Sequence, residues 1–192
     1  MSVALAAPPI ERYRLSSGVF HEMIEKGILG EDERVELIEG ELITMSPIGS
    51  EHMGVVNQLT ETLIRQLERR ALVGVQGPIH LDDHSEPQPD LILLAPQDDF
   101  YKRSLPRPAD ILLVIEVADS SLAYDRTVKM PLYANAGIPE VWIVNLTDRW
   151  IEVYRDPSPA GYTTLLKILP GKSVAPHAFA DVVVSVNELL EQ

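Results

Sequence analysis

The stretch ILLVIEVADSS, residues 111–121, decides the fold of this chain. Five consecutive apolar residues precede Glu116, and Val117 and Ala118 follow it. A run this apolar and this β-branched predicts a strand that is buried on both faces of a sheet. A carboxylate near the end of such a strand is costly unless it has a partner, a metal ion or a shifted pKa. Glu116 is therefore the first candidate for a functional residue.

The segments on either side predict strands and helices in alternation. Helices are expected over residues 16–26, 52–70 and about 121–136, and strands over 75–81, 90–94, 111–117, 140–145 and 150–155. Two short strands are expected within 34–46, and weaker strands with a helix near 186–190 close the chain. Strands joined by a crossover helix indicate an α/β sheet with mixed pairing.

Two residues mark expected irregularities in the helices. Gly74 is expected to stop the second helix. Pro131 falls inside the third, where it removes a hydrogen-bond donor. The helix therefore either begins at Thr127, which places Pro131 in the first turn, or begins earlier and is kinked.

Composition predicts one domain without disulfides. The 192 residues are 45% hydrophobic and 23% charged, so we expect a single domain over residues 11–192 after a loosely ordered tail, 1–10. The absence of cysteine excludes thiol catalysis and Cys-based zinc sites and fits a cytoplasmic protein. The N-terminus lacks a basic region and a long apolar run, so no signal peptide is expected. No apolar run approaches the ~20 residues of a membrane span.

The net charge of -13 counts against a broad nucleic-acid-binding surface, because phosphates are bound by Lys and Arg. A local basic strip or a homodimer would answer that objection. The residues proposed for the strip are Arg65, Arg69, Lys102, Arg103 and Arg107. The acids cluster in residues 31–41 and 82–90, which is typical of a solvated face and otherwise of a cation site.

Three charged residues are positioned for joint chemistry. Asp90 opens one predicted strand, Glu116 lies near the end of the next, and Lys129 sits on the helix that follows. Adjacent strands would bring the two carboxylates together, where they repel unless a cation lies between them. Mg²⁺ is typically held by one or two carboxylates, waters and substrate phosphate. A nearby ammonium then stabilises charge or orients a water, which suits hydrolysis of a phosphodiester.

Three segments in order carry a family resemblance: EPQPDLILL, ILLVIEVADSS and YDRTVKMPLYANAGIPEVWIVN. Together they resemble the PD-(D/E)xK nuclease superfamily and, more closely, the bacterial Uma-two family of restriction-endonuclease-like proteins, over about residues 34–154. The resemblance implies a restriction-endonuclease-like α/β (α+β) fold, with a central mixed β-sheet flanked by helices and extra strands at both ends. It also implies an endonuclease that acts on DNA with Mg²⁺, or Mn²⁺ in its place.

The resemblance assigns roles by position. Pro89-Asp90 matches the PD motif, and the segment Glu116 to Ala118 matches (D/E)xK, except that Ala118 stands where the superfamily has lysine. In the related family the lysine lies on the next helix, which makes Lys129 its equivalent. Asp90, Glu116 and the Val117 carbonyl are then the implied metal ligands.

Further residues are supporting candidates. Asp125, Lys129 and Tyr133 are spaced four residues apart, so they share one helix face. By the resemblance, Glu36 matches a family glutamate in the first hairpin, and His52 matches a histidine before the long helix.

Each candidate also has a purely structural interpretation. Asp90 would cap a strand, Glu116 would pair with an Arg of the long helix, and Lys129 would be an ordinary ion-pair partner. Glu36 would be a surface acid of the hairpin, and His52 a polar residue at a helix start.

The hypothesis that these residues favour is a Mg²⁺-dependent endonuclease in which Asp90 and Glu116 hold the metal and Lys129 assists. Glu36 is expected to join the catalytic set, as a further ligand or through a water. Two alternatives stay open. The acidic composition and the missing lysine at position 118 also fit a non-catalytic protein-interaction module on a nuclease-like fold. A small-molecule phosphodiesterase would share the site and would be indicated by a narrow, closed pocket.

Overall fold

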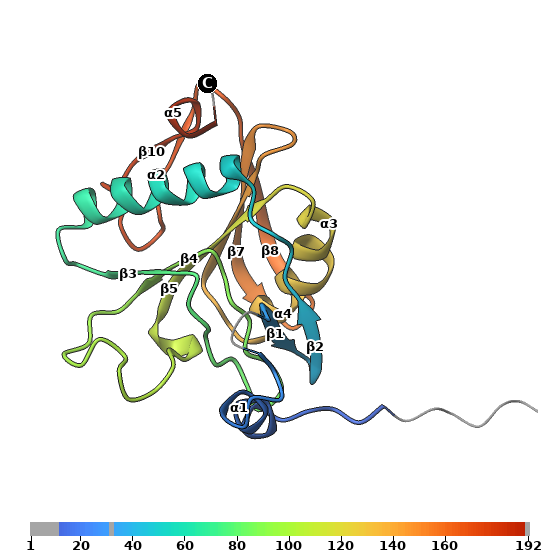
Figure 1. The fold of residues 1–192 in the computed structure, drawn as a ribbon. Helices are drawn as coiled ribbons and strands as arrows, with labels where there is room; N and C mark the ends of the chain where they lie inside the picture. Colours follow the sequence, from blue (N-terminus) through green and yellow to red (C-terminus); the bar gives the residue numbers. More distant parts are fainter. Residues whose placement is uncertain (1–11, 31–32, 191–192) are drawn as a thin grey trace, which may run out of the picture.

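The computed structural model describes residues 12–30 and 33–190, so the predicted tail lies outside the described residues. Its centre is a six-stranded sheet in the order β3-β4-β5-β6-β7-β8 (Figure 1). The strands are β3 (Leu72–Val75), β4 (Leu91–Leu94), β5 (Ile111–Ala118), β6 (Glu140–Asn145), β7 (Trp150–Ser158) and β8 (Gly161–Ile168). Only the β5–β6 pair in this sheet is parallel, which confirms the predicted mixed sheet.

Helices cover the sheet on both faces. The amphipathic helix α2 (Ser50–Leu67) and the short α5 (Val186–Leu190) pack on one face, where Leu59 and Leu63 join the core that includes Ile115. The helical segment made of α3 (Leu122–Tyr124), the π-helical turn η2 (Asp125–Lys129) and α4 (Met130–Asn135) packs on the other. β4 and β5 are buried on both faces, so their side chains are apolar, with the exception of Glu116 near the end of β5.

Small strands flank the main sheet at both ends, as predicted. β1 (Val35–Ile38) and β2 (Glu41–Thr44) form a hairpin after helix α1 (Ser17–Glu25), and β9 (Ser173–Val174) pairs with β10 (Val184–Ser185). A β-bridge between Leu37 and Glu86 and a hydrogen bond from the Gly40 N–H to the His84 carbonyl tie the first hairpin to the loop before β4. A short 3-10 turn, η1 (Pro108–Asp110), leads into β5.

The predicted strand over residues 75–81 is wrong. The strand β3 ends at Val75, and the following residues run as a loop in which Ile79 is buried but bonds to the Pro87 carbonyl. Gly74 does not stop the helix; it lies within β3, where a Cβ would stand 2.7 Å from Cγ1 of Ile92. The glycine is required by the close approach of neighbouring side chains.

Replacing Gly74 by Ala should therefore lower the free energy of unfolding by about 1–3 kcal/mol, the usual cost of an overpacked core. Gly54→Ala is the matched control, because no atom lies within 4 Å of its added Cβ and α2 is helical there. The control should be neutral or stabilising by up to about 1 kcal/mol. Urea unfolding of both variants measures the difference, and equal effects would contradict the crowding at position 74.

The helical segment α3-η2-α4 shows which of the two predictions for Pro131 is right. It begins at Leu122, so the Thr127 N-cap is wrong, and the irregularity before the proline takes the form of η2. Proline has no N–H, and its ring collides with the carbonyl four residues earlier, so the helix widens to a π turn ahead of it. The Met130 N–H accordingly donates to the Asp125 carbonyl, five residues back.

Candidate active site

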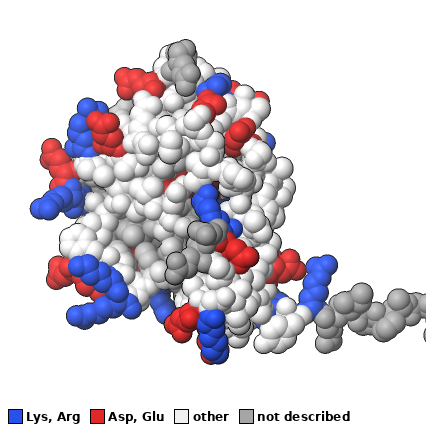
Figure 2. Space-filling view, viewed as in Figure 1, with Lys and Arg blue, Asp and Glu red and all other residues white. Residues whose placement is uncertain are grey.

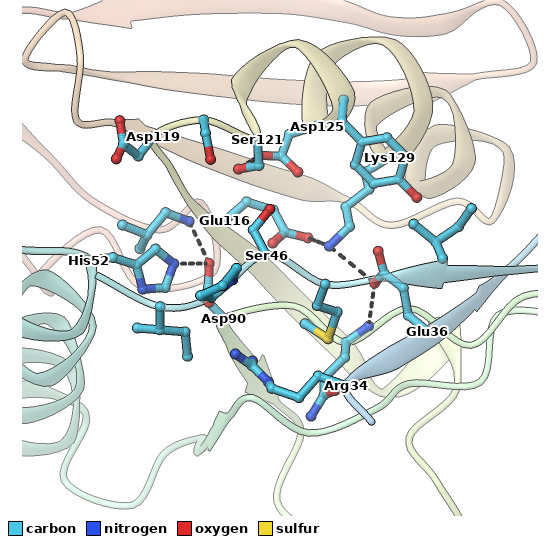
Figure 3. Close-up of a pocket in the computed structure, with 18 of the residues that line it drawn as sticks. Arg34, Glu36, Ser46, His52, Asp90, Glu116, Asp119, Ser121, Asp125 and Lys129 are labelled. Atoms are coloured by element: carbon cyan, nitrogen blue, oxygen red, sulfur yellow. Dashed lines mark hydrogen bonds and ion pairs between the residues drawn. The ribbon is translucent and has the colours of Figure 1, made fainter. Parts of the chain in front are cut away.

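Asp90 and Glu116 meet at the end of the β4–β5 pair. The antiparallel register pairs Leu91 with Ile115, which places the next residues, Asp90 and Glu116, opposite each other. Side chains alternate along a strand, so both carboxylates face the side of the sheet that carries α4. The Val117 N–H donates a 2.9 Å hydrogen bond to Oδ2 of Asp90 (Figure 3).

Lys129 lies between two carboxylates from different parts of the chain. Its Nζ is 3.1 Å from Oε1 of Glu116 and 3.3 Å from Oε2 of Glu36, and its side chain is only 7% exposed. The Tyr133 hydroxyl donates to the same Glu116 oxygen at 2.6 Å. The turn η2 directs Lys129 and Asp125 toward the same cavity (Figure 3). The partner of Glu116 is thus this lysine and not an arginine of the long helix.

His52, in the first turn of α2, contacts Asp90 and fixes the orientation of its carboxylate. Its Nε2 is 3.1 Å from Oδ2 of Asp90, and that hydrogen bond raises the pKa of His52 despite partial burial. Nδ1 of His52 and the hydroxyl of Tyr124 are the two buried side-chain polar atoms without a hydrogen-bond partner in the described part of the chain. Both belong to residues that line the same cavity. Buried polar atoms normally have partners, so water or a ligand is expected here.

These side chains surround a cavity of about 300 Å³. Its acids are Glu36, Asp90, Glu116, Asp119 and Asp125, its cations are Arg34 and Lys129, and Ile43, Met45, Pro47 and Ile48 form an apolar wall. The cavity is therefore acidic at its floor and apolar along one side.

Burial, and to a smaller extent the neighbouring carboxylates, raises the pKa values of two acids in the cavity. Burial raises the pKa of Glu116 to about 8, and the charges of Asp125 and Asp90 add to the effect while Lys129 opposes it. Burial also raises the pKa of Asp125 to about 6. For Lys129, burial alone would lower the pKa, but the charges of Glu116, Glu36 and Asp125 outweigh it and keep the ammonium protonated. The ammonium of Lys129 thus stays charged, and Glu116 takes up a proton more readily than an exposed glutamate does.

The donor set fits a hard divalent cation. Across residues 12–30 and 33–190, no three His, Asp or Glu side chains are close enough together to hold a metal by themselves. Asp90 and Glu116 with the Val117 carbonyl would supply two carboxylates and one backbone oxygen, the number that Mg²⁺ uses when waters complete its shell. The unpartnered Nδ1 of His52 and hydroxyl of Tyr124 are suited to bind such waters.

The structure brings the sequence-predicted residues together. Tyr133 contacts Glu116, and the other predicted residues line the cavity: Glu36, His52, Asp90, Glu116, Val117, Asp125 and Lys129. Their roles as ligands and catalysts remain predictions. The proposed basic strip does not reach the cavity, since none of its five residues lines it.

Sequence reasoning missed Arg34, Asp119, Ser121 and Tyr124, which also line the cavity. Arg34 had a usable signal, because it stands two residues before Glu36 at the start of a strand and alternation places both on one face. Asp119 and Ser121 follow the strand end that carries Glu116, so their position was visible in the sequence as well.

Comparisons with known proteins agree with the fold. A solved structure from Anabaena variabilis, described as a "putative nuclease belonging to DUF820", superposes with a TM-score of 0.70 at 18% identity, covering 88% of this chain and 96% of that one. Among curated proteins none matches the sequence. The family model described as "Putative restriction endonuclease" matches residues 11–187.

The fold is restriction-endonuclease-like, a mixed sheet with helices on both faces and a carboxylate-lysine cluster at the end of two central strands. The family match spans most of the sequence, so the chain belongs to the Uma2 family. In the described part of the chain, no helix is long and apolar enough to cross a membrane.

Proposed function

We propose that this protein is a Mg²⁺-dependent nuclease that hydrolyses phosphodiester bonds in DNA. The observation that carries the proposal is the convergence of Asp90, Glu116 and a buried, charged Lys129 on one cavity. Two unpartnered polar atoms in the same cavity indicate that protein groups alone do not complete the site. Membership of the Uma2 family and the fold shared with a protein described as a nuclease support the same chemistry.

Each residue has a task that its contacts support. Asp90 and Glu116 would hold the metal, which supplies positive charge for the phosphate and acidifies a bound water. His52 and the Val117 N–H fix the orientation of Asp90, and Tyr133 fixes that of Glu116. The Lys129 ammonium is positioned to stabilise charge that develops on the phosphate or to orient the attacking water.

Glu36 acts through Lys129 in this proposal. It holds the ammonium from the side opposite Glu116 and is itself fixed by the N–H of Gln88 at 3.1 Å. Glu36 thus restricts the ammonium to the floor of the cavity.

A phosphodiesterase acting on small molecules is the second candidate. The observation that favours it is the small cavity with five acids and two cations, which offers few contacts to a long polyanion. Incubation with supercoiled plasmid, single-stranded circular DNA and a chromogenic phosphodiester, each with Mg²⁺ and with EDTA, separates the two. Cleavage of the small substrate alone would replace the nuclease proposal.

Magnesium affinity should increase with pH. Glu116 can bind a cation only as a carboxylate. Because the pKa of Glu116 is about 8, cation binding below that pH must first remove a proton from Glu116. The apparent affinity should rise up to about tenfold per pH unit between pH 6 and 8 and level off above. Calorimetric titration in buffers of different ionisation enthalpy measures both the affinity and the released proton.

Glu22→Gln is the control for that titration, since Glu22 is exposed and pairs with Lys26 on α1. Its magnesium affinity should follow the wild-type curve. Binding that does not depend on pH would remove Glu116 from the ligand set. No binding at any pH, with DNA present, would leave the nuclease proposal without a mechanism.

A further inference from the structure

Of the two cations in the cavity, Arg34 is the one available to a substrate. Lys129 is enclosed by Glu116 and Glu36, whereas the half-buried Arg34 has no ion pair within the described residues. Its backbone is held in place, because the Arg34 carbonyl accepts from the Met45 N–H at 2.9 Å. A guanidinium on a fixed backbone, beside a cavity whose carboxylates suit a divalent cation, can bind a phosphate with two parallel hydrogen bonds.

The face of the molecule that carries no continuous basic stripe offers little to a double helix. On the face seen in Figure 2, the described Lys and Arg side chains lie in separate groups, most of them beside acids, and form no continuous stripe. A duplex binder typically neutralises several phosphates along a rigid backbone. This cavity offers one available cation, in a chain of net charge -13.

The cavity itself matches a smaller and more flexible target. Its volume of about 300 Å³ lies at the lower end of ligand pockets. Its charged floor is recessed, since the Glu116 side chain is 4% exposed. The apolar wall contains Met45, Pro47 and Ile48, which suits contact with a base or sugar. A phosphate must enter to reach the floor, and a single strand can bend its backbone and expose unstacked bases in a way that a duplex cannot.

We propose that the cavity binds one nucleotide of a single-stranded nucleic acid, with Arg34 holding its phosphate and the apolar wall contacting its base. This inference rests on the proposed function and specifies its substrate. Frayed ends and displaced strands are included, because they present the same flexible backbone.

Binding of a fluorescein-labelled eight-nucleotide oligothymidine, followed by anisotropy, tests the inference. The Asp90→Asn variant serves as background, because it should not cleave. The single strand should bind better than a hairpin duplex, with a slope of log affinity against log salt of about -1 to -2. Arg34→Gln should weaken binding about tenfold or more and make the slope shallower by about 0.7, whereas Arg34→Lys should keep the slope. Arg103→Gln, in the exposed basic loop, is the matched control and should change neither.

The inference would be overturned by no binding of the single strand, by a slope unaffected by Arg34→Gln, or by a slope that responds to Arg103→Gln instead. Tighter and steeply salt-dependent binding of the duplex would do the same. The proposed function is tested separately by the wild type. If the wild type binds magnesium and cleaves DNA but Arg34→Gln does not change single-strand binding, only the inference is contradicted. If the protein binds the single strand but no magnesium, only the nuclease proposal is contradicted.

Discussion

Asp90→Asn should abolish Mg²⁺ binding and lower the rate of DNA cleavage by about three orders of magnitude or more. The amide has the shape of the carboxylate and can still accept the hydrogen bond from the Val117 N–H, so the fold should be kept. It lacks the negative charge that a hard cation requires. A metal contributes several kcal/mol of transition-state stabilisation, and each 1.36 kcal/mol is a factor of ten in rate.

Asp156→Asn provides the matched control for that experiment. Asp156 is exposed on β7, accepts a hydrogen bond from Thr164 and has a φ of 58°, a conformation that asparagine tolerates well. Calorimetry and plasmid cleavage should give wild-type results for the control. Cleavage retained by Asp90→Asn would contradict the metal site, as would an equal loss in both variants.

The central strands could be predicted because their signal is local. The run that becomes β5 is apolar except for Glu116, and the next strand, β6, lies one helix further along the chain. The wrong strand over 75–81 shows the limit of that signal. Ile79 and His80 do carry backbone hydrogen bonds, but to the carbonyls of Pro87 and Pro106 rather than to a neighbouring strand. The spacing of apolar residues predicts which side chains are buried, but it does not show whether the backbone pairs with a neighbouring strand.

The position of Asp90 and Glu116 could be predicted because the strands that carry them have a local sequence signal. Asp90 and Glu116 are brought together by the pairing of adjacent strands, which a sequence pattern can indicate. The contact between Glu36 and Lys129 depends on how a separate hairpin docks, and no local pattern encodes that. The residues of the basic strip lie away from the cavity: Arg65 is 13 residues beyond His52 on α2, roughly 20 Å along the helix.

Lys129→Met should lower the free energy of unfolding by about 3–5 kcal/mol at pH 8.5, the usual cost of removing one partner of a buried ion pair. The substitution keeps most of the side-chain length but leaves Glu116 and Glu36 without their cation. Lys26→Met is the control, because Lys26 is exposed and its pair with Glu22 should contribute less than about 0.5 kcal/mol. DNA cleavage should be lost in the Lys129 variant only.

The pH dependence of that loss separates charge from packing. The folded-state pKa of Glu116, about 8, lies above its unfolded value, so its protonated form favours folding at low pH and this contribution disappears as pH rises through 8. Without the ammonium the pKa rises further, so the difference from wild type should be largest above pH 8 and smallest near pH 5.5. Urea unfolding at both pH values measures it. A difference that does not change with pH would mean that the methylene groups of Lys129 stabilise the fold by packing, and the ammonium would then have no established part in the electrostatics of the cavity.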